Sequence, residues 1–474
     1  MCGIVGVFNV GKPFSVTSDM MTALQYRGEQ GAGIALAKKD GNFFYERTLG
    51  LNLELSGKIE NLHLNESDYF AGIGHLRYGT SGSRRSLENA QPLHCKTSWG
   101  EIYIGHNGDT PYFNEMKASL SEQGRVFLTD SDTEFILHHI GLSKEADPIT
   151  AIKHGLRSYK GTYAIVMLVE TAQGVKLIAA RDPSGNRPLT LGKLDGGYIV
   201  ASENSAFETV NGEFIREIRP NELLVISGAG IEKHHIEPML VIDTARVKFH
   251  QCIFENIYFS FPSSNVFGIP VDLFREELGQ KAARRYGHLI GGDDIVTNPP
   301  DSSNFFIDGF CKELKRQPEK VFLRRHSIKI RSFTQESEET RDAAIRRKFS
   351  IRGHLVTGKR VWLLDDSVVR GKTSKKLVRS LRNNGAVWVG VLSSCPPIIG
   401  PCHKGIDMTD DLIAAKHMKD GQVDIEGIRK EIEADFVGYL TFEDVFEVIS
   451  SFRLNPENFC FGCFQNREPI WHKW

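Results

Sequence analysis

The stretch VWLLDDSVVRGKTSKK, residues 361–376, decides the fold of the second half of the chain. Its apolar run, 361–364, stops at two carboxylates, Asp365 and Asp366, and a short polar turn follows. A helix-like segment then continues to Gly385, after which a second apolar run begins. Strand, turn, helix and strand in this order predict a βαβ unit of a parallel sheet.

The turn of this unit has the composition of an anion site. Ligands of open parallel sheets bind beyond the carboxyl ends of the strands, and a helix start offers backbone N–H groups to an anion. Paired carboxylates suit sugar hydroxyls, or a divalent cation that bridges to a polyphosphate. We therefore predict a site for a phosphorylated sugar. Two alternatives stay open: an ordinary βα turn with a solvated acidic pair, and a Walker A loop whose first glycine position is occupied by Asp366.

The overall composition excludes several classes of protein. The chain has 474 residues, of which 41% are hydrophobic and 25% charged, with a formal net charge of −1. This is an ordinary globular composition with room for two or three domains. No basic excess points to a nucleic-acid or membrane partner, and no apolar run approaches the roughly 20 residues of a membrane span. The first residues form no basic leader, so we expect a cytoplasmic chain whose eight cysteines form no structural disulfides.

Cys2 precedes an apolar, strand-like run, residues 3–8. Removal of Met1, which is usual when the second residue is small, would make Cys2 the N-terminal residue. A thiol and an α-amine have ordinary pKa values of about 8.5 and about 7.7–8.0, so the amine can take the thiol proton near neutral pH. The alternative is a buried cysteine at the start of a strand.

Four further motifs in the first half supply groups that would complete such a site. Each sets a charged, amide or glycine residue beside a strand-like or helix-like run. They can provide an oxyanion-binding amide with a neighbouring N–H group, and an arginine and an aspartate for the two charges of an amino acid. The motifs are YRGEQGAG (26–33), GHLRYGTSG (74–82), IGHNGD (104–109) and TDSDTE (129–134).

Together with the opening Cys-Gly-Ile-Val-Gly, these motifs resemble those of the class II, or N-terminal-nucleophile, glutamine amidotransferases. The resemblance implies a four-layer αββα sandwich. Cys2 would attack the glutamine amide, while Asn107 and the Gly108 N–H would hold the oxyanion. Arg77 and Asp132 would bind the α-carboxylate and the α-amine of glutamine. The implied catalytic residues are Cys2, Asn107 and Gly108, and the implied glutamine-binding residues are Arg77, Asp132, Arg27 and Thr80.

A second strand-like run, within DDIVTNPPDSSNFF (293–306), also leads through a polar turn into a helix-like segment. Such a turn suits a pyrophosphate or Mg²⁺. This block and the opening stretch, with its D-D-x-x-x-x-G-x-T pattern, resemble the type I phosphoribosyltransferases, which bind 5-phosphoribosyl 1-pyrophosphate (PRPP). By that resemblance Asp365 and Asp366 hold the ribose hydroxyls and Mg²⁺, Ser302 is a further Mg²⁺ ligand, and residues 370–374 cradle the 5-phosphate. The implied PRPP-binding residues are Asp301, Ser303, Asp365, Asp366, Ser367, Arg370, Gly371, Lys372, Thr373 and Ser374.

A class II glutaminase followed by a phosphoribosyltransferase is the layout of the amidophosphoribosyltransferase family, which the chain resembles over nearly its whole length. We expect a glutaminase domain at 2–240, a phosphoribosyltransferase domain at 250–455 and a tail at 456–474. The implied reaction hydrolyses glutamine at Cys2 and passes ammonia internally to C1 of PRPP. The products would be 5-phosphoribosylamine, glutamate and pyrophosphate, in the first step of purine synthesis. The resemblance also implies a homo-oligomer, a tetramer or a dimer.

Cys460-x-x-Cys463, taken alone, leaves a zinc site, a redox pair and no site at all open. The iron–sulfur branch of the same family carries a [4Fe–4S] cluster. The residues that match its four ligand positions are Cys252, Cys402, Cys460 and Cys463. The resemblance therefore implies a structural cluster that ties the tail to the domain junction. Cys95, Cys311 and Cys395 match no ligand position.

Several positions on the acceptor side depart from the family pattern. Lys372 stands where a threonine is usual, and Phe261 and Ser263 replace an arginine and an aspartate. The loop that closes over PRPP lacks its usual tyrosine and glycine within HSIKIRSF (326–333). Three hypotheses stay open: an amidophosphoribosyltransferase with a divergent lid, a paralogue that aminates another phosphorylated sugar, and a non-catalytic binding module.

Overall fold

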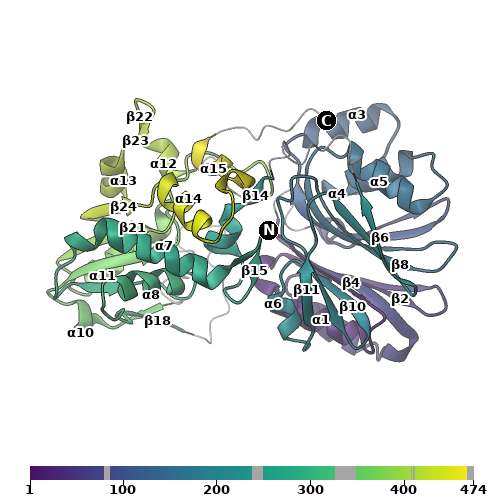
Figure 1. Ribbon diagram of the computed structural model, residues 1–474, viewed down its shortest axis with the longest axis horizontal. Helices are drawn as coiled ribbons and strands as arrows, with labels where there is room; N and C mark the ends of the chain where they lie inside the picture. Colours follow the sequence, from purple (N-terminus) through teal and green to yellow (C-terminus); the bar gives the residue numbers. More distant parts are fainter. Residues whose placement is uncertain (80–85, 237–248, 326–348, 407, 409–410, 467–474) are drawn as a thin grey trace.

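The computed structural model describes the chain apart from residues 80–85, 237–248, 326–348, 407, 409–410 and 467–474. Figure 1 shows two lobes side by side, one made by the first half of the chain and the other by the second half. The N-terminus lies where the lobes meet (Figure 1), and Met1 packs in a core cluster made otherwise of second-half residues. Thr80 and the lid stretch at 326–333 fall outside the described residues.

Two antiparallel sheets form the first lobe. Over the described residues, the seven-stranded sheet has the order β11-β9-β10-β1-β4-β2-β3, and the six-stranded sheet has the order β13-β12-β8-β7-β6-β5. The strands of the first sheet are β1 (Gly3–Phe8), β2 (Gly31–Lys38), β3 (Phe43–Leu49), β4 (Tyr69–Arg77), β9 (Thr190–Leu194), β10 (Gly197–Ala201) and β11 (Glu213–Glu217). The strands of the second sheet are β5 (Leu93–Thr97), β6 (Gly100–Asp109), β7 (Thr162–Val169), β8 (Lys176–Arg181), β12 (Glu222–Ser227) and β13 (Gly230–His235).

The two sheets face each other and helices cover their outer faces, so the lobe has the four layers αββα. Side chains alternate along β1: Ile4 and Phe8 enter the core between the sheets, whereas Val5 and Val7 enter the core beneath α1 and α2. This two-residue period is expected of a strand that is buried on both faces. The helices of this lobe are α1 (Pro13–Ala23), α2 (Asn52–Glu60), α3 (Phe113–Glu122), α4 (Thr133–Leu142), α5 (Pro148–Ser158) and α6 (Ser205–Glu208).

A parallel sheet of order β17-β20-β21-β24 forms the centre of the second lobe. The predicted βαβ unit is confirmed, with β20 (Arg360–Asp365), α11 (Lys372–Asn383) and β21 (Trp388–Ser393) in succession. Along β20, Trp362 and Leu364 pack toward α7, α8 and α14, whereas Val361 and Leu363 pack toward α11 and α13. The remaining elements of this core are β17 (Ile295–Thr297), β24 (Phe436–Tyr439), α7 (Val271–Tyr286), α8 (Asn304–Glu313), α13 (Ile425–Glu431) and α14 (Phe442–Ser451). Smaller elements are β15 (Asn265–Val266), β16 (Ile269–Pro270), β18 (Phe322–Arg324), β19 (Phe349–Ile351), α10 (Gly353–Val356), α12 (Ile413–Lys416), β22 (Met418–Lys419), β23 (Gln422–Val423) and α15 (Gly462–Gln465).

A short parallel pair closes the junction between the lobes. β14 (Gln251–Cys252) pairs with β25 (Phe459–Cys460), so the tail returns to the point where the second lobe begins. The predicted fold class is thus confirmed: an αββα sandwich followed by a parallel-sheet domain. Among the helices that the structure describes, none combines the length and apolar character needed to cross a bilayer.

Candidate active site

Cys2 stands immediately before β1 and is buried. Its thiol lies beside the Tyr78 backbone: Sγ donates to the Tyr78 carbonyl oxygen at 3.8 Å, and the Tyr78 N–H donates to Sγ at 3.5 Å. The register of the sheet produces this contact, because Gly3 of β1 pairs with Leu76 of β4. Burial raises the pKa of the Cys2 thiol.

Asn107 reaches Cys2 from β6, a strand of the other sheet. Its Oδ1 accepts a hydrogen bond of 3.2 Å from the Cys2 N–H. Its Nδ2 is buried and has no hydrogen-bond partner among the described residues. The next residue, Gly108, has no room for a side chain, since a Cβ there would lie 1.9 Å from the Thr162 carbonyl oxygen. An unused amide donor beside a thiol, followed by a glycine, is an arrangement that can bind an oxyanion.

Arg77 and Asp132 approach the same thiol. Both side chains are buried, and both interact electrostatically with Cys2. Arg77 ends β4, whereas Asp132 immediately precedes α4 and accepts a hydrogen bond of 2.9 Å from the Tyr159 hydroxyl. The structure therefore brings together five of the predicted residues: Cys2, Arg77, Asn107, Gly108 and Asp132.

Arg27, a predicted glutamine ligand, is occupied by other partners. Its buried guanidinium forms ion pairs with Glu203 and, at 3.0 Å, with Glu255 of the second lobe. Its Nε donates to the Cys2 carbonyl oxygen at 3.0 Å. In this conformation Arg27 supports the backbone of Cys2 and joins it to the second lobe.

Two groups beside this site, the half-buried Asp109 and the buried His106, were missed by the sequence analysis, although both stand in the IGHNGD motif. The pKa of Asp109 is raised to about 8, first by burial and then by the nearby Asp132 carboxylate. His106 places Nδ1 3.1 Å from the Thr133 hydroxyl and Nε2 3.2 Å from the Thr162 carbonyl oxygen. Their position in the motif could have marked Asp109 and His106 as site residues. The residues that they contact come from other elements, so the local sequence did not reveal those contacts.

In the second lobe, the loops that follow three neighbouring parallel strands meet. Asp365 ends β20, Asp366 follows it, and both are buried. The Ser302 hydroxyl, from the loop after β17, donates to the Asp366 carboxylate. After β21, the Ser394 N–H donates to the Asp365 carbonyl at 3.0 Å and its hydroxyl donates to the Asp366 carbonyl at 2.8 Å. Burial raises the pKa of Asp366, although Ser302 and the Ser367 hydroxyl favour its ionised form.

Gly371 begins α11 in a conformation that suits glycine. Its φ is +70°, and a Cβ there would lie 2.4 Å from the Ile413 Cδ1. In the described part of the chain, no side chain caps this helix start. The N–H groups of residues 372–374 precede the first helical hydrogen bond, which runs from Lys375 to Gly371. They are therefore available to an anion. The predicted ligands Ser367, Arg370, Thr373 and Ser374 lie in this turn or in the first turn of the helix.

Three predicted PRPP ligands have side chains that are engaged elsewhere. The Lys372 Nζ lies 3.4 Å from Asp411, so its charge is paired with a carboxylate rather than left for a phosphate. The Ser303 hydroxyl donates to the Pro299 carbonyl at 3.0 Å. The Asp301 carboxylate pairs with Arg324. Asp411 and Arg324 are distant in the sequence, whereas Pro299 lies four residues before Ser303 in the same loop.

The four cysteines of the predicted cluster come from three segments that meet at the junction of the lobes. Cys252 is the register partner of Cys460. The Cys463 carbonyl accepts hydrogen bonds of 3.0 and 2.9 Å from the N–H groups of residues 399 and 400, close in the chain to Cys402. The thiol of Cys463 interacts electrostatically with those of Cys402, Cys252 and Cys460, and also with that of Cys395.

This donor set suits a [4Fe–4S] cluster or a tetrahedral zinc ion, since all four cysteines are free. Burial raises the pKa of Cys252 to about 12 and that of Cys463 well above its ordinary value, which a bound cation would reverse. In the described conformation, no three cysteine, histidine, aspartate or glutamate side chains of the described residues converge closely enough to hold a metal ion. The chemistry of the four thiols fits a cluster, and binding one requires that they turn toward a common centre.

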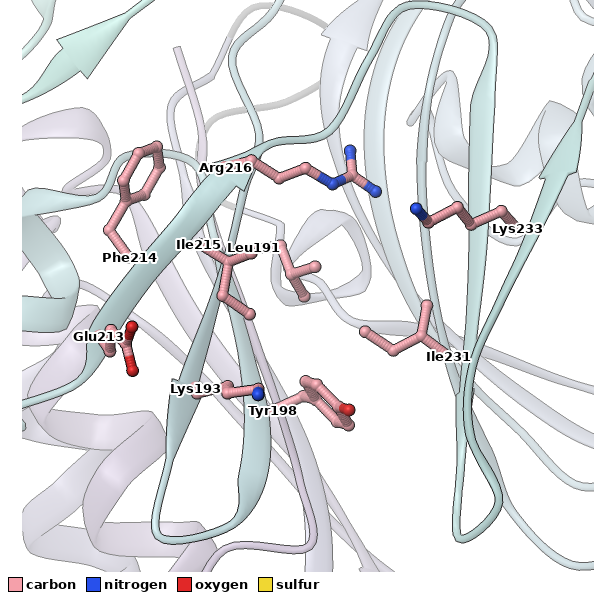
Figure 2. A pocket seen from close by; sticks show the side chains of 9 residues that line it. All are labelled: Leu191, Lys193, Tyr198, Glu213, Phe214, Ile215, Arg216, Ile231 and Lys233. Carbon is pink, nitrogen blue, oxygen red and sulfur yellow. The ribbon is translucent and has the colours of Figure 1, made fainter.

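Away from both sites, an open groove of about 420 Å³ lies between the edges of the two sheets of the first lobe (Figure 2). Arg216 of β11 and Lys233 of β13 extend toward one another across it (Figure 2), and Arg216 pairs with Glu222 at 2.7 Å. No residue of the predicted sites lines this groove.

Comparison with known proteins places both lobes in one family. A family model described as a glutamine amidotransferase domain matches residues 81–209. The amidophosphoribosyltransferase of Bacillus subtilis is 34% identical over 473 residues, which cover 99% of this chain and 94% of the relative. That of Archaeoglobus fulgidus is 34% identical over 481 residues, with 99% and 98% covered.

Solved structures agree with these sequence relatives. The glutamine PRPP amidotransferase of B. subtilis, complexed with ADP and GMP, matches with a TM-score of 0.86 and 33% identity, covering 99% of this chain and 97% of that one. A structure described as the allosteric regulatory enzyme of purine biosynthesis matches with a TM-score of 0.87 and 33% identity, covering 99% and 96%. The similarity thus includes the sandwich, the parallel-sheet domain and the tail. The chain belongs to the amidophosphoribosyltransferase family.

Proposed function

We propose that the protein is a glutamine-dependent amidophosphoribosyltransferase, which transfers ammonia from glutamine to C1 of PRPP in the first step of purine synthesis. The observation that carries this proposal is the Asn107 Nδ2, buried beside Cys2 and without a hydrogen-bond partner among the described residues. A buried donor that remains unpaired costs about 1–3 kcal/mol. An oxyanion formed on glutamine would satisfy it.

In the first half-reaction, the Cys2 Sγ attacks the side-chain amide carbon of glutamine. The carbon–nitrogen bond then breaks, ammonia leaves with the proton taken from the thiol, and a thioester remains. Water hydrolyses the thioester and releases glutamate. Asn107 and the Gly108 N–H stabilise the oxyanion of both steps, while Arg77 and Asp132 bind the α-carboxylate and the α-amine.

The proposal requires the removal of Met1. While Met1 is attached, the Cys2 nitrogen is an amide that donates to Asn107, and an amide nitrogen cannot accept the thiol proton. After removal, the Cys2 α-amine has an ordinary pKa of about 8 and can act as the base.

In the second half-reaction, ammonia attacks C1 of PRPP while the bond from C1 to the pyrophosphate oxygen breaks. Asp365 and Asp366 bind the ribose hydroxyls and, with Ser302, would hold Mg²⁺. The first turn of α11 binds the 5-phosphate through its backbone N–H groups. Mg²⁺, when bound, neutralises charge that develops on the departing pyrophosphate.

The four cysteines at the junction would hold a [4Fe–4S] cluster that stabilises the attachment of the tail. They are Cys252, Cys402, Cys460 and Cys463. We also propose that the protein is a cytoplasmic homo-oligomer, a tetramer or a dimer, with a glutaminase domain at 2–240, a phosphoribosyltransferase domain at 250–455 and a tail at 456–474.

Another phosphorylated sugar is the second candidate for the acceptor. The position of Lys372 favours it, because this lysine stands in the phosphate turn where a threonine is usual in the family. Its Nζ pairs with Asp411 at 3.4 Å, so the charge pattern at the start of α11 differs from the family pattern.

The test uses the purified full chain, with removal of Met1 verified by mass spectrometry. With glutamine, PRPP and Mg²⁺ it should form glutamate and pyrophosphate in equal amounts. Cys2→Ala should abolish the use of glutamine and spare amination from added ammonia. Release of glutamate without consumption of PRPP would reject PRPP and support the second candidate. Absence of glutamate from the processed chain would reject the glutaminase assignment.

A further inference from the structure

Residues 182–187, in the loop between β8 and β9, contact the four-cysteine site directly and are linked to the nucleophile through two further side chains. Asp182 fixes its conformation, because its carboxylate accepts hydrogen bonds from the N–H groups of Ser184 at 2.9 Å and Asn186 at 3.3 Å. The same carboxylate accepts from the Tyr163 N–H of β7 at 3.2 Å. Since β7 pairs with β6, the loop is held in place relative to the strand of the proposed oxyanion site.

One side of this loop holds the segments that carry two of the four cysteines. The Asn186 carbonyl accepts a hydrogen bond of 3.2 Å from the Cys252 N–H. Arg187 donates to the Lys404 carbonyl oxygen, and the Lys404 N–H donates to the Cys402 Sγ at 3.4 Å. The Arg187 guanidinium also interacts electrostatically with Cys252 and Cys402.

The other side of the loop faces the nucleophile. The Arg187 Nη1 contacts the Met1 sulfur and lies 3.6 Å from the Glu255 carboxylate. Glu255 pairs with Arg27 at 3.0 Å, and the Arg27 Nε donates to the Cys2 carbonyl at 3.0 Å. Arg187 is thus linked to the backbone of Cys2 through Glu255 and Arg27.

The packing at this joint is tight. A Cβ at Gly405 would lie 3.0 Å from the Gly108 carbonyl oxygen and 3.2 Å from the Arg187 Nη2. From β7, the Thr162 hydroxyl donates to the Lys404 carbonyl oxygen at 3.4 Å. The segment at 402–405 is therefore held between Arg187 and the oxyanion strand, so that a shift of this segment displaces Gly108.

Charge reinforces this arrangement. Arg187 has 0% exposure, and a buried guanidinium is stable when anions surround it. Glu255 supplies one such anion, since its carboxylate lies 3.6 Å from the Arg187 Nη1.

We propose that Arg187 is a positioning residue that couples the four-cysteine site to the glutamine site. It holds the 402–405 segment, which carries Cys402, against the oxyanion strand. The part of this inference that concerns glutamine rests on the proposed function. The part that concerns the contact between the segments does not.

The experiment compares Arg187→Lys and Arg187→Met with Arg181→Lys and Arg181→Met in the full chain. Arg181 is a matched control, since it is 1% exposed, flanks the same loop and lies over the Phe267 ring at 5.5 Å. It donates to the carbonyl oxygens of Ile218 and Gly185 rather than to Lys404.

The first readout is amide hydrogen exchange of peptides that contain 105–109 and 400–406. The second is glutamine hydrolysis against amination from added ammonia, with kcat and KM resolved. The third is the rate at which a chelator bleaches the visible absorbance of the protein as isolated.

We expect Arg187→Met to raise hydrogen exchange in both peptides, to lower kcat for glutamine about tenfold to a hundredfold and to speed bleaching by a similar factor. Amination from ammonia should persist, which shows that the chain is folded, and Arg187→Lys should recover part of each loss. Arg181→Met should lower thermal stability without these changes. Equal exchange at 105–109 in the two methionine variants would overturn the coupling even if glutamine were not a substrate. A wild-type chain without glutaminase activity would instead overturn the proposed function and leave the exchange and bleaching results as the test of the coupling.

Discussion

The Cys2 backbone nitrogen donates a 3.2 Å hydrogen bond to the Asn107 side-chain oxygen, although 105 residues separate the two in the chain. The bond joins the first strand of one sheet to a central strand of the other. It also commits the Asn107 oxygen to the protein, which leaves the amide nitrogen for a ligand. The Asn107 oxygen therefore orients Cys2, whereas the Asn107 nitrogen is the donor proposed for the oxyanion. Because the two roles use different atoms, a mutation can separate them.

Asn107→Asp keeps the acceptor for Cys2 and removes the amide donor. We expect glutamine hydrolysis to fall about 100- to 1,000-fold, the usual effect of losing one oxyanion donor, while amination from ammonia is unchanged. Glutamate release is the measurement. Asn52→Asp is the control, because Asn52 is equally buried but donates to the Ser18 carbonyl at 2.9 Å. Full glutaminase activity in Asn107→Asp would refute the oxyanion role.

Gly108→Ala should disrupt the same site through sterics alone. The added Cβ would lie 1.9 Å from the Thr162 carbonyl oxygen and 2.4 Å from the His106 Nε2, so β6 must move. We expect loss of most glutamine hydrolysis, by about 100-fold or more. Gly105→Ala on the same strand is the comparison, since its nearest contact would be 3.4 Å from a Val166 methyl group. Equal activity in the two variants would contradict the prediction.

Asp109 makes stability depend on pH in a direction opposite to that of most carboxylates. Its pKa is about 8 in the folded chain, against about 3.9 when unfolded. Between these values the folded state binds more protons than the unfolded state, so the free energy of unfolding falls as pH rises. Asp109→Asn should therefore gain in melting temperature relative to wild type between pH 6 and pH 8.5. A difference in melting temperature that stays constant over this range for Asp109→Asn would reject the raised pKa.

Asp366→Asn should separate the two half-reactions. The Asp366 carboxylate accepts hydrogen bonds from Ser302 and Ser367, so its loss weakens the joint between two loops as well as the expected ribose contact. We expect PRPP-dependent amination to fall about tenfold to a hundredfold, with glutamine hydrolysis in the absence of PRPP retained.

Lys372→Ala should change the KM for PRPP less than about fivefold, because its charge is paired with Asp411 at a largely exposed position. A larger effect of Lys372→Ala than of Asp366→Asn would reverse this assignment.

Cys463→Ser should remove bound iron from the protein as isolated. Cys463 interacts electrostatically with the other three proposed ligands, whereas Cys311, also buried, lies on α8 and matches no ligand position. Cys311→Ser is therefore expected to retain the iron content of the wild type. Iron analysis and visible absorbance measure both variants. Equal iron in the two variants would exclude Cys463 as a ligand.

Patterns confined to a few neighbouring residues predicted the fold well. The strand before Asp365 and the helix after Gly371 follow from an apolar run that ends sharply and a polar turn, and Gly3–Phe8 is a strand as expected. α1 begins at Pro13, because proline can occupy the first turn of a helix.

The partners of charged side chains were not predictable in the same way. Lys372 resembles a phosphate ligand in sequence, yet it pairs with Asp411 from a distant loop. Arg27 stands in a motif beside the expected glutamine pocket, yet Glu203 and Glu255 occupy its guanidinium. Coulomb attraction acts across space and carries no local sequence period, so such pairs emerge only when the segments are placed together.

The pairing of β14 with β25 fixes the order in which parts of the protein can fold during synthesis. During synthesis, the strands of the sandwich leave the ribosome early, and each pairs only with other strands of the first half of the chain. The strand that holds Cys252 must wait for residues 459–460, which are made long afterwards. We therefore expect nascent chains that stop short of these residues to present a protease-resistant first lobe and an open junction. Assembly of the four-cysteine site would then be a late event in maturation, following rather than guiding the folding of the first lobe.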